Sequence, residues 1–245
     1  MRRSLIALAV VAVMVLAASV PASAQSWFQL RFNPSNADWK QTPPIWGDLP
    51  YKFNTTMFGG TAFIQPPGYG VGLRFNIDSG SLGSWSPLTF YDGGTWRYYD
   101  ISVGLPLSLG TGSMLLFAGY GNHSWKATDG GTTISTQDAS GIVFGADMRL
   151  PLSGAWYATG SLTFGSGLKY KYANPGFWDP RAEGTANTSV YSAALGYMLP
   201  NYPLNVELGW RSGGFSVTSI TSGDTSAAGQ DVRWSGWFLG LSTRR

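Results

Sequence analysis

The single histidine of the chain is the first residue to test for chemistry, because a serine follows it directly. His123 lies in the segment Gly121-Asn122-His123-Ser124-Trp125, and a histidine that deprotonates a serine hydroxyl is the basis of nucleophilic catalysis. Adjacent residues of a β-strand point to opposite faces, so these two side chains cannot share a site in the strand expected here. Asp78 and Asp100 complete no other pattern with this histidine. We predict that the protein is not an enzyme and that His123 is an ordinary histidine at the rim of the fold.

Metal and cofactor chemistry also has little basis in the sequence. The chain has no cysteine and one histidine, so oxygen ligands of the kind that calcium prefers are the remaining donors. Asp92-Gly93-Gly94-Thr95 and Asp129-Gly130-Gly131-Thr132 repeat one another, but Asp-Gly is first of all a turn signal. We expect no metal and no cofactor.

The composition and the N-terminus indicate an exported, β-rich chain. The 245 residues include 33 glycines and 15% aromatic residues but only 12% charged residues, which argues against disorder and against a coiled coil. Residues 1–24 contain two arginines, a long apolar run and a final Ala22-Ser23-Ala24, the pattern of a cleaved signal peptide. The remaining domain, 25–245, keeps 14 basic and 13 acidic residues, so nucleic acid is not an expected partner.

Alternation with a period of two runs through this domain and predicts long β-strands. In the segment 69–78 the odd positions are apolar or aromatic and the even positions are glycine or polar. In 156–172 the even-numbered apolar residues, Tyr170 among them, should face one way and Lys169 and Lys171 the other. We expect about ten strands, with eight as the alternative count: 26–33, 55–64, 69–78, 96–108, 113–126, 137–150, 155–171, 186–199, 203–219 and 230–243.

Short and long connections alternate between these strands. Tight, turn-rich joints fall at 65–68, 109–112, 151–154 and 200–202. Longer, polar, glycine-rich connections fall at 34–54, 79–95, 127–136, 172–185 and 220–229. An even number of strands with this alternation places both chain ends on the side of the short joints.

This combination resembles the small bacterial outer-membrane β-barrel proteins, the group of the OmpA-like and porin-like barrels. Segments such as Met114–Gly121 and Trp237–Ser242 are similar to strands of that group, and the resemblance in pattern covers 25–245. It implies an all-β fold: a closed antiparallel transmembrane barrel with short periplasmic turns and longer extracellular loops, in the outer membrane of a Gram-negative-type bacterium. The chain departs from the group at its end, where Arg245 stands in place of the usual aromatic residue.

The physics of a sheet in lipid leads to the same fold. A sheet can span a bilayer only if it closes, because every backbone polar group must be paired inside the protein. A secreted β-sandwich would also alternate, but it would not require the nearly uncharged outward strand middles of this sequence. We expect outer-membrane lipid as a partner, contacted by one aromatic girdle near the short turns (Tyr69, Trp156 and Tyr197) and one near the long loops (Tyr170, Tyr172 and Trp210).

The charged residues on the inward faces form the main candidate site. Spaced along tilted strands, they should fall into layers across the lumen, where opposite charges pair. In the layer nearest the short turns we predict an ion-paired plug, with Arg74 and Arg149 facing Asp147 and Glu207. The full set comprises Arg31, Arg74, Asp78, Asp100, Asp147, Arg149, Lys169, Lys171, Glu207 and Arg211.

A narrow lumen with paired charges favours a structural protein or a narrow pore that conducts poorly. The alternative is a closed barrel whose extracellular loops bind a surface ligand or partner through exposed aromatic residues: Trp39, Trp46, Phe177 and Trp178. A barrel-embedded hydrolase is a distant third. A small solute or an extracellular ligand is the partner to expect, and the sequence specifies neither one nor the oligomeric state.

Overall fold

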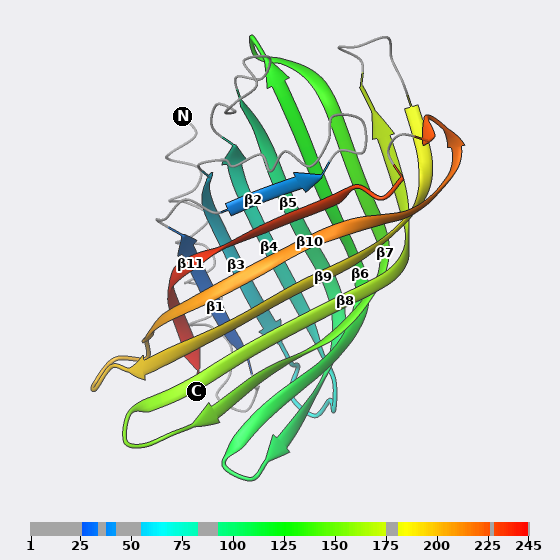
Figure 1. The fold of residues 1–245 in the computed structure, drawn as a ribbon. Helices are drawn as coiled ribbons and strands as arrows, with labels where there is room; N and C mark the ends of the chain where they lie inside the picture. Colours follow the sequence, from blue (N-terminus) through cyan, green and yellow to red (C-terminus); the bar gives the residue numbers. More distant parts are fainter. Residues whose placement is uncertain are drawn as a thin grey trace.

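The chain forms one closed antiparallel β-barrel (Figure 1). The computed structural model describes residues 26–33, 38–42, 55–82, 93–174, 181–225 and 228–244. β3 to β11 pair in chain order, and β1 closes the barrel by pairing with both β3 and β11. The predicted barrel of ten strands is confirmed, and β2 is an additional short strand. In the described residues the strands are β1 (Trp27–Asn33), β2 (Asp38–Thr42), β3 (Thr55–Ile64), β4 (Gly72–Leu82), β5 (Gly93–Leu109), β6 (Gly112–Asp129), β7 (Thr132–Pro151), β8 (Trp156–Ala173), β9 (Arg181–Met198), β10 (Asn205–Gly223) and β11 (Asp231–Arg244).

Two short strands, β1 and β2, share the seam of the barrel. β1 pairs with the last residues of β11, with Leu30 opposite Leu241. β2 pairs with the first residues of β11, with Trp39 opposite Trp234. The sequence predicts a loop over 34–54, so β2 is a correction. β1 is too short to cover all of β11, and pairing with β2 satisfies the edge that β1 leaves open.

The two ends of the barrel differ in their connections. We call the end with the tight joints the turn end and the opposite end the loop end; β1 begins and β11 ends at the turn end, as predicted (Figure 1). The strands extend into all the long connections that the sequence predicts, most of all at 127–136, which β6 and β7 nearly fill. Gly130 and Gly131 alone connect them, with φ of +54° and +79°. A two-residue hairpin needs positive φ at both positions, which glycine adopts without strain.

A broad apolar band covers the outside of the barrel over its turn-end half. Outward side chains such as Leu73, Val103 and Phe144 are exposed there. At the turn end Trp156 packs edge-on against Tyr197, with ring centres 4.9 Å apart, in the girdle predicted for that side. At the other border of the band lie exposed aromatic side chains of β5, β6, β9 and β11: Tyr99, Tyr120, Tyr191 and Trp237. An apolar band with aromatic borders is the surface that a bilayer covers.

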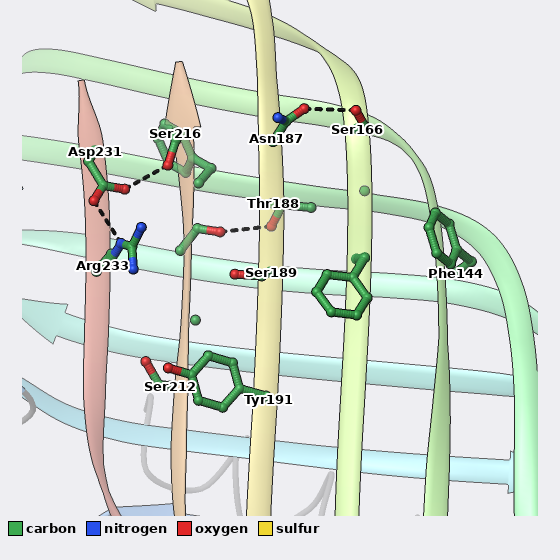
Figure 2. Close-up of a pocket in the computed structure, with 15 residues that line it drawn as sticks. Phe144, Ser166, Asn187, Thr188, Ser189, Tyr191, Ser212, Ser216, Asp231 and Arg233 are labelled. Carbon is green, nitrogen blue, oxygen red and sulfur yellow. Dashed lines mark hydrogen bonds and ion pairs between the residues drawn. The ribbon is translucent and has the colours of Figure 1, made fainter. Parts of the chain in front are cut away.

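A ring of mostly small polar side chains borders this band on the loop-end side. On each strand from β3 to β11 it is the outward position that follows the last apolar one: Thr56, Ser79, Arg97, Asn122, Ser140, Ser166, Ser189, Ser212 and Ser235. Figure 2 shows the part of this polar ring on β8, β9 and β10. Farther toward the loop end the outward face carries charged side chains, including Lys126 and Arg233. The polar ring therefore marks the edge of the apolar band.

A β-bulge in β8 lies next to the polar ring. Between Gly165 and Leu168 the strand has one residue more than its neighbour β9 has between the paired residues Thr188 and Ala186. Gly167, inside the bulge, has a φ of +66°. Because side chains alternate with a period of two, one inserted residue exchanges the inner and outer faces of everything beyond it.

The side chains beyond this bulge accordingly face opposite to the prediction. Tyr170 is 0% exposed and lies in the barrel interior. Lys169 and Lys171 are exposed on the outside, where Lys171 lies 3.9 Å from Glu183 on β9. The predictions of an inward Lys169 and Lys171 and of an outward Tyr170 are wrong, because strict alternation was extended through the bulge.

The interior of the loop-end half is a hydrophobic core. Trp96 and Trp234 pack with ring centres 4.5 Å apart and ring planes inclined by 58°. Aromatic and aliphatic side chains of β3 and of β5 to β11 surround them. The buried members of this aromatic core are Met57, Trp96, Tyr98, Trp125, Ala127, Ile134, Ala139, Leu168, Tyr170, Ala182, Ala186, Val190, Phe215, Val217, Val232 and Trp234. Within the described residues, no helix is long and apolar enough to cross a membrane.

The two halves of the barrel therefore have opposite polarity patterns. The strands β5 to β10 have 17 to 20 residues, whereas about 9–11 residues of a tilted strand cross a bilayer. The turn-end half spans the apolar band, and the loop-end half projects beyond it with a water-compatible exterior around the aromatic core.

We predict that Leu162→Arg destabilises the barrel by about 2–4 kcal/mol, since Leu162 faces outward in the middle of the apolar band, where lipid surrounds the charge. Ser124→Arg is the matched control, because Ser124 faces outward on the loop-end side of the polar ring. The free energy of unfolding in lipid vesicles, from urea titrations, measures both. Equal losses would contradict the assignment of the membrane-covered surface.

Candidate functional site

The charged lumen is centred on Arg74 of β4, which is buried in the turn-end half. Its Nε donates to Asp147 at 2.6 Å and its Nη2 donates to the same carboxylate at 3.3 Å. Its Nη1 donates to Asp100 on β5. The guanidinium carbon lies 3.8 Å above the ring centre of Phe117. One arginine thus joins β4, β5 and β7 across the inside of the barrel.

Two further arginines, Arg31 and Arg211, share the carboxylate of Asp78 on β4. Arg31 Nη2 lies 3.1 Å from one oxygen of Asp78, and Arg211 Nη2 lies 2.5 Å from the other. Arg31 also donates to Thr61 at 2.6 Å. These contacts connect β1, β3, β4 and β10, so they cross the seam of the barrel.

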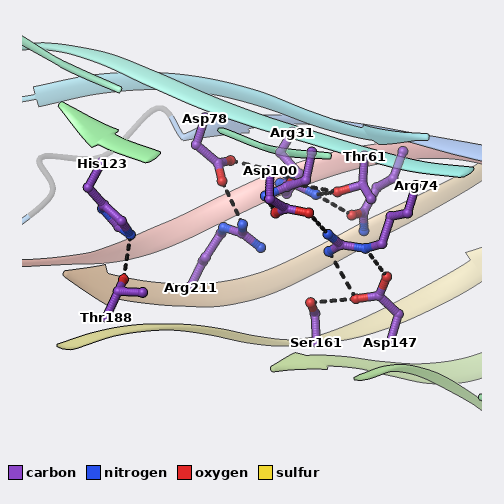
Figure 3. Close-up of polar contacts among 12 residues, drawn as sticks. Arg31, Thr61, Arg74, Asp78, Asp100, His123, Asp147, Ser161, Thr188 and Arg211 are labelled. Atoms are coloured by element: carbon purple, nitrogen blue, oxygen red, sulfur yellow. Dashed lines mark hydrogen bonds and ion pairs between the residues drawn. The ribbon is translucent and has the colours of Figure 1, made fainter. Parts of the chain in front are cut away.

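Asn76 links the two ion-pair groups, whose arginines and aspartates are labelled in Figure 3, into one network. Its Oδ1 accepts from Arg31 at 2.7 Å, and its Nδ2 donates to Asp100 at 3.1 Å. The hydroxyl of Ser102 donates to Asp100 at 3.1 Å, and the hydroxyl of Ser161 donates to Asp147 at 2.6 Å. We call the set Arg31, Arg74, Asn76, Asp78, Asp100, Asp147 and Arg211 the lumen network. It contains three arginines and three aspartates, so it is electrically neutral, as buried charges in a region of low dielectric require.

Glu207 and Arg149 do not form the ion pair that the sequence predicts. Glu207 is buried, and it accepts hydrogen bonds from Gln29, from Tyr157 at 2.9 Å and from Ser242 at 2.8 Å. The guanidinium carbon of Arg149 lies 3.5 Å above the ring centre of Tyr157. Tyr157 thus stands in contact with both residues, donating from its hydroxyl to the carboxylate and offering its ring face to the cation. The predicted pairing of Arg74 with Asp147 is confirmed, and that of Arg149 with Glu207 is wrong.

A polar cavity of about 250 Å³ lies at the turn end below the lumen network. Its lining includes Gln29, Arg149 and Glu207 on one side and apolar residues such as Phe63 and Met114 on another. Arg31 and Asp147 contribute to both the lining and the network. The ion-paired residues Arg31 and Asp147 therefore form part of the inner wall of the cavity.

His123 lies in the interior rather than at the rim. Its side chain is 0% exposed, and its ring centre lies 4.4 Å from that of Tyr98 and 6.0 Å from that of Phe215. Nε2 is 2.6 Å from the hydroxyl of Thr188, which also donates to the carbonyl of Gly214 at 2.8 Å. The prediction of a rim histidine is wrong, because the strands continue well beyond it, and this packing gives no support to a hydrolase.

Sequence reasoning missed the aromatic core as part of the lumen. Trp96, Tyr98 and Trp125 occupy inward positions of β5 and β6, and their alternation could have revealed them. Of the aromatic residues predicted to contact ligands, Trp39 lies in β2. Trp46, Phe177 and Trp178 lie outside the described residues, as do the predicted signal peptide, 1–24, and Arg245.

Comparison with known proteins identifies the fold. Scans against protein-family models and curated proteins find no match. Among solved structures, the outer-membrane protease OmpT from Escherichia coli is similar with a TM-score of 0.52 and 12% identity, over 91% of this chain and 94% of that chain. The translocator domain of the autotransporter NalP from Neisseria meningitidis has a TM-score of 0.45 and 13% identity, over 100% of this chain and 96% of that chain. The closed sheet and its likeness to OmpT give this chain the fold of an outer-membrane β-barrel protein.

We predict that Arg74→Met destabilises the protein by about 3–5 kcal/mol, because it leaves Asp100 and Asp147 buried without their cation. Unfolding in lipid vesicles, followed by tryptophan fluorescence, measures the loss. Lys171→Met is the control, since its pair with Glu183 is more than half exposed and should contribute less than about 1 kcal/mol. Adding Asp100→Asn and Asp147→Asn to Arg74→Met should recover part of the loss, and a loss no larger than that of the control would contradict the role of the network.

Proposed function

We propose that this chain is a non-enzymatic structural barrel of the outer membrane, with a lumen sealed at two levels in series. The observation that carries the proposal is the order of the two layers along the barrel axis. The lumen network crosses the interior at the level of the apolar band, and the aromatic core fills the half beyond it. A ten-stranded barrel is narrow enough for side chains to fill its interior. An ion would have to separate buried ion pairs and then pass closely packed aromatic rings, which supports poor conduction.

Binding of an extracellular ligand or partner is the second candidate. Its support is the loop-end half, in which strands that leave the membrane continue around their own hydrophobic core. The loop ends of these strands therefore lie beyond the apolar band, where an extracellular ligand could reach them; the predicted contact residues Trp46, Phe177 and Trp178 lie outside the described residues. A sealed lumen favours this candidate over transport, because it leaves the outer surfaces as the place where the protein acts.

The conductance prediction follows from two seals in series. Wild-type protein in planar bilayers should show no large, steady channels. Glu207→Gln should not open the barrel either, because Glu207 lies in the turn-end cavity below the lumen network. The double variant Trp96→Ala/Trp234→Ala and the variant Arg211→Ala each weaken one seal, and only their combination should raise single-channel conductance clearly.

Large, steady channels in wild type would overturn the sealed barrel in favour of an open pore. Heat-modifiable migration on gels, which reports a folded barrel, should accompany every conductance measurement, so that an open lumen is distinguished from a misfolded one.

The proposed location rests on the N-terminal sequence together with the fold. We expect cell fractionation to place the mature protein in the outer membrane, with Gln25 as its first residue by N-terminal sequencing, because Ala22-Ser23-Ala24 precedes it as a cleavage signal. Replacing Ala22 and Ala24 with bulky residues should leave the precursor uncleaved. Recovery of wild type as a soluble periplasmic protein would contradict the location.

A further inference from the structure

A groove of about 380 Å³ opens on the outer wall of the barrel, across β8 to β11 (Figure 2). It lies at the polar ring, where the apolar band ends. Its floor is formed by small outward residues of β9 and β10, with Ser189 between Gly214 on one side and Phe164 on the other. Ser212, although on the outer face, is only 8% exposed. This is a depression in the wall and not part of the lumen.

The backbone keeps the groove open. A Cβ atom at Gly214 would lie 2.0 Å from the carbonyl oxygen of Val232, so no side chain can occupy this position. The bulge in β8 forms the opposite edge, where Asn187 Oδ1 accepts from the hydroxyl of Ser166 at 2.9 Å and from the backbone N–H of Gly167 at 3.2 Å. The strand pairing and the bulge thus create the depression.

The lining of the groove divides by polarity along the direction of the membrane normal. Toward the turn end it is aromatic, with Phe144 and Phe164 at ring centres 6.3 Å apart and Tyr191 beside them. These side chains belong to the surface that acyl chains cover. Toward the loop end the lining is hydroxyl and amide groups, followed by a charged pair on β11 (Figure 2).

The charged pair presents a cation at the polar side. Arg233 Nε donates to Asp231 at 2.7 Å, and Ser216 donates to the other oxygen of that carboxylate at 2.7 Å. This contact fixes the arginine stem, while 66% of the side chain stays exposed. The bulge turns a second cation, Lys169, to the same outer face on β8. Phosphate bound to arginine is one of the stronger charge-assisted interactions.

We propose that this groove binds one membrane lipid with an anionic, phosphate-bearing headgroup from the leaflet at the loop end. The headgroup phosphate contacts Arg233 and the hydroxyl groups of the polar ring. An acyl chain lies against Phe164, Phe144 and Tyr191. The position of the groove supports a lipid over a soluble ligand, because the groove crosses the border of the apolar band and its turn-end lining, Phe144, Phe164 and Tyr191, belongs to that band.

Native mass spectrometry of the folded full chain, released from micelles that contain phosphatidylglycerol, tests the proposal. Wild type should retain one lipid, and phosphatidylcholine at the same concentration should be retained less. Arg233→Gln should lower retention of phosphatidylglycerol about tenfold, as expected for loss of one charge-assisted contact. Ser189→Phe should abolish retention by filling the groove, whereas Ser189→Ala should preserve it.

Lys126→Gln is the matched charge control, since Lys126 is exposed above the polar ring on β6, away from the groove. It should retain lipid like wild type, and all variants should keep wild-type heat-modifiability. Equal retention by wild type, Arg233→Gln and Ser189→Phe would overturn the proposal in favour of a nonspecific lipid annulus. Displacement of the lipid by inorganic phosphate, or equally tight binding of glycerophosphoglycerol without acyl chains, would overturn it in favour of a soluble phosphate ligand.

Discussion

Arg74 and its two aspartates define the electrostatic constraint on which the interior depends. The barrel wall at this level is surrounded by hydrocarbon, so charges that point inward must find their partners among one another and the polar groups of the lumen. Arg74 meets Asp100 and Asp147, and Arg31 and Arg211 share Asp78. Asn76 joins the two groups by donating to one and accepting from the other. Because these residues come from strands around the whole circumference, satisfying the charges also fixes which strands face each other.

The reversal of polarity along the barrel follows from the medium outside. Where lipid covers the wall, the outward positions are apolar, and the polar residues of each alternating strand face the lumen. Beyond the polar ring the exterior meets water, and the same alternation places tryptophans and tyrosines inside, as in a soluble protein. The barrel thus has two interiors, the lumen network in the turn-end half and the aromatic core in the loop-end half, and the long strands run through both.

The sequence predicts the fold well because alternation and turn signals are local properties. The strand pattern, the closed barrel, the turn-end girdle and the Arg74–Asp147 pair all follow from them. Alternation fails at the bulge in β8, because one inserted residue leaves only a weak local signal, Ser166-Gly167, yet reverses Lys169 and Tyr170. The partner of Arg149 depends on rotamers and on Tyr157 of the next strand, which spacing alone does not specify.

The register shifts in the strand pairing occur at particular levels relative to the membrane. Register shifts lie between Gly165 and Leu168 in β8, beyond Val217 in β10 and at Ala127 in β6, all at or beyond the polar ring. A bulge leaves a backbone group without its ladder partner, which is tolerable in water or among headgroups but costly in hydrocarbon. These register shifts therefore avoid the middle of the apolar band, and the bilayer border is the first place where the wall departs from regular pairing. There the bulge in β8 borders a depression with bare backbone and hydroxyl groups, at the level where lipid headgroups are expected to replace acyl chains.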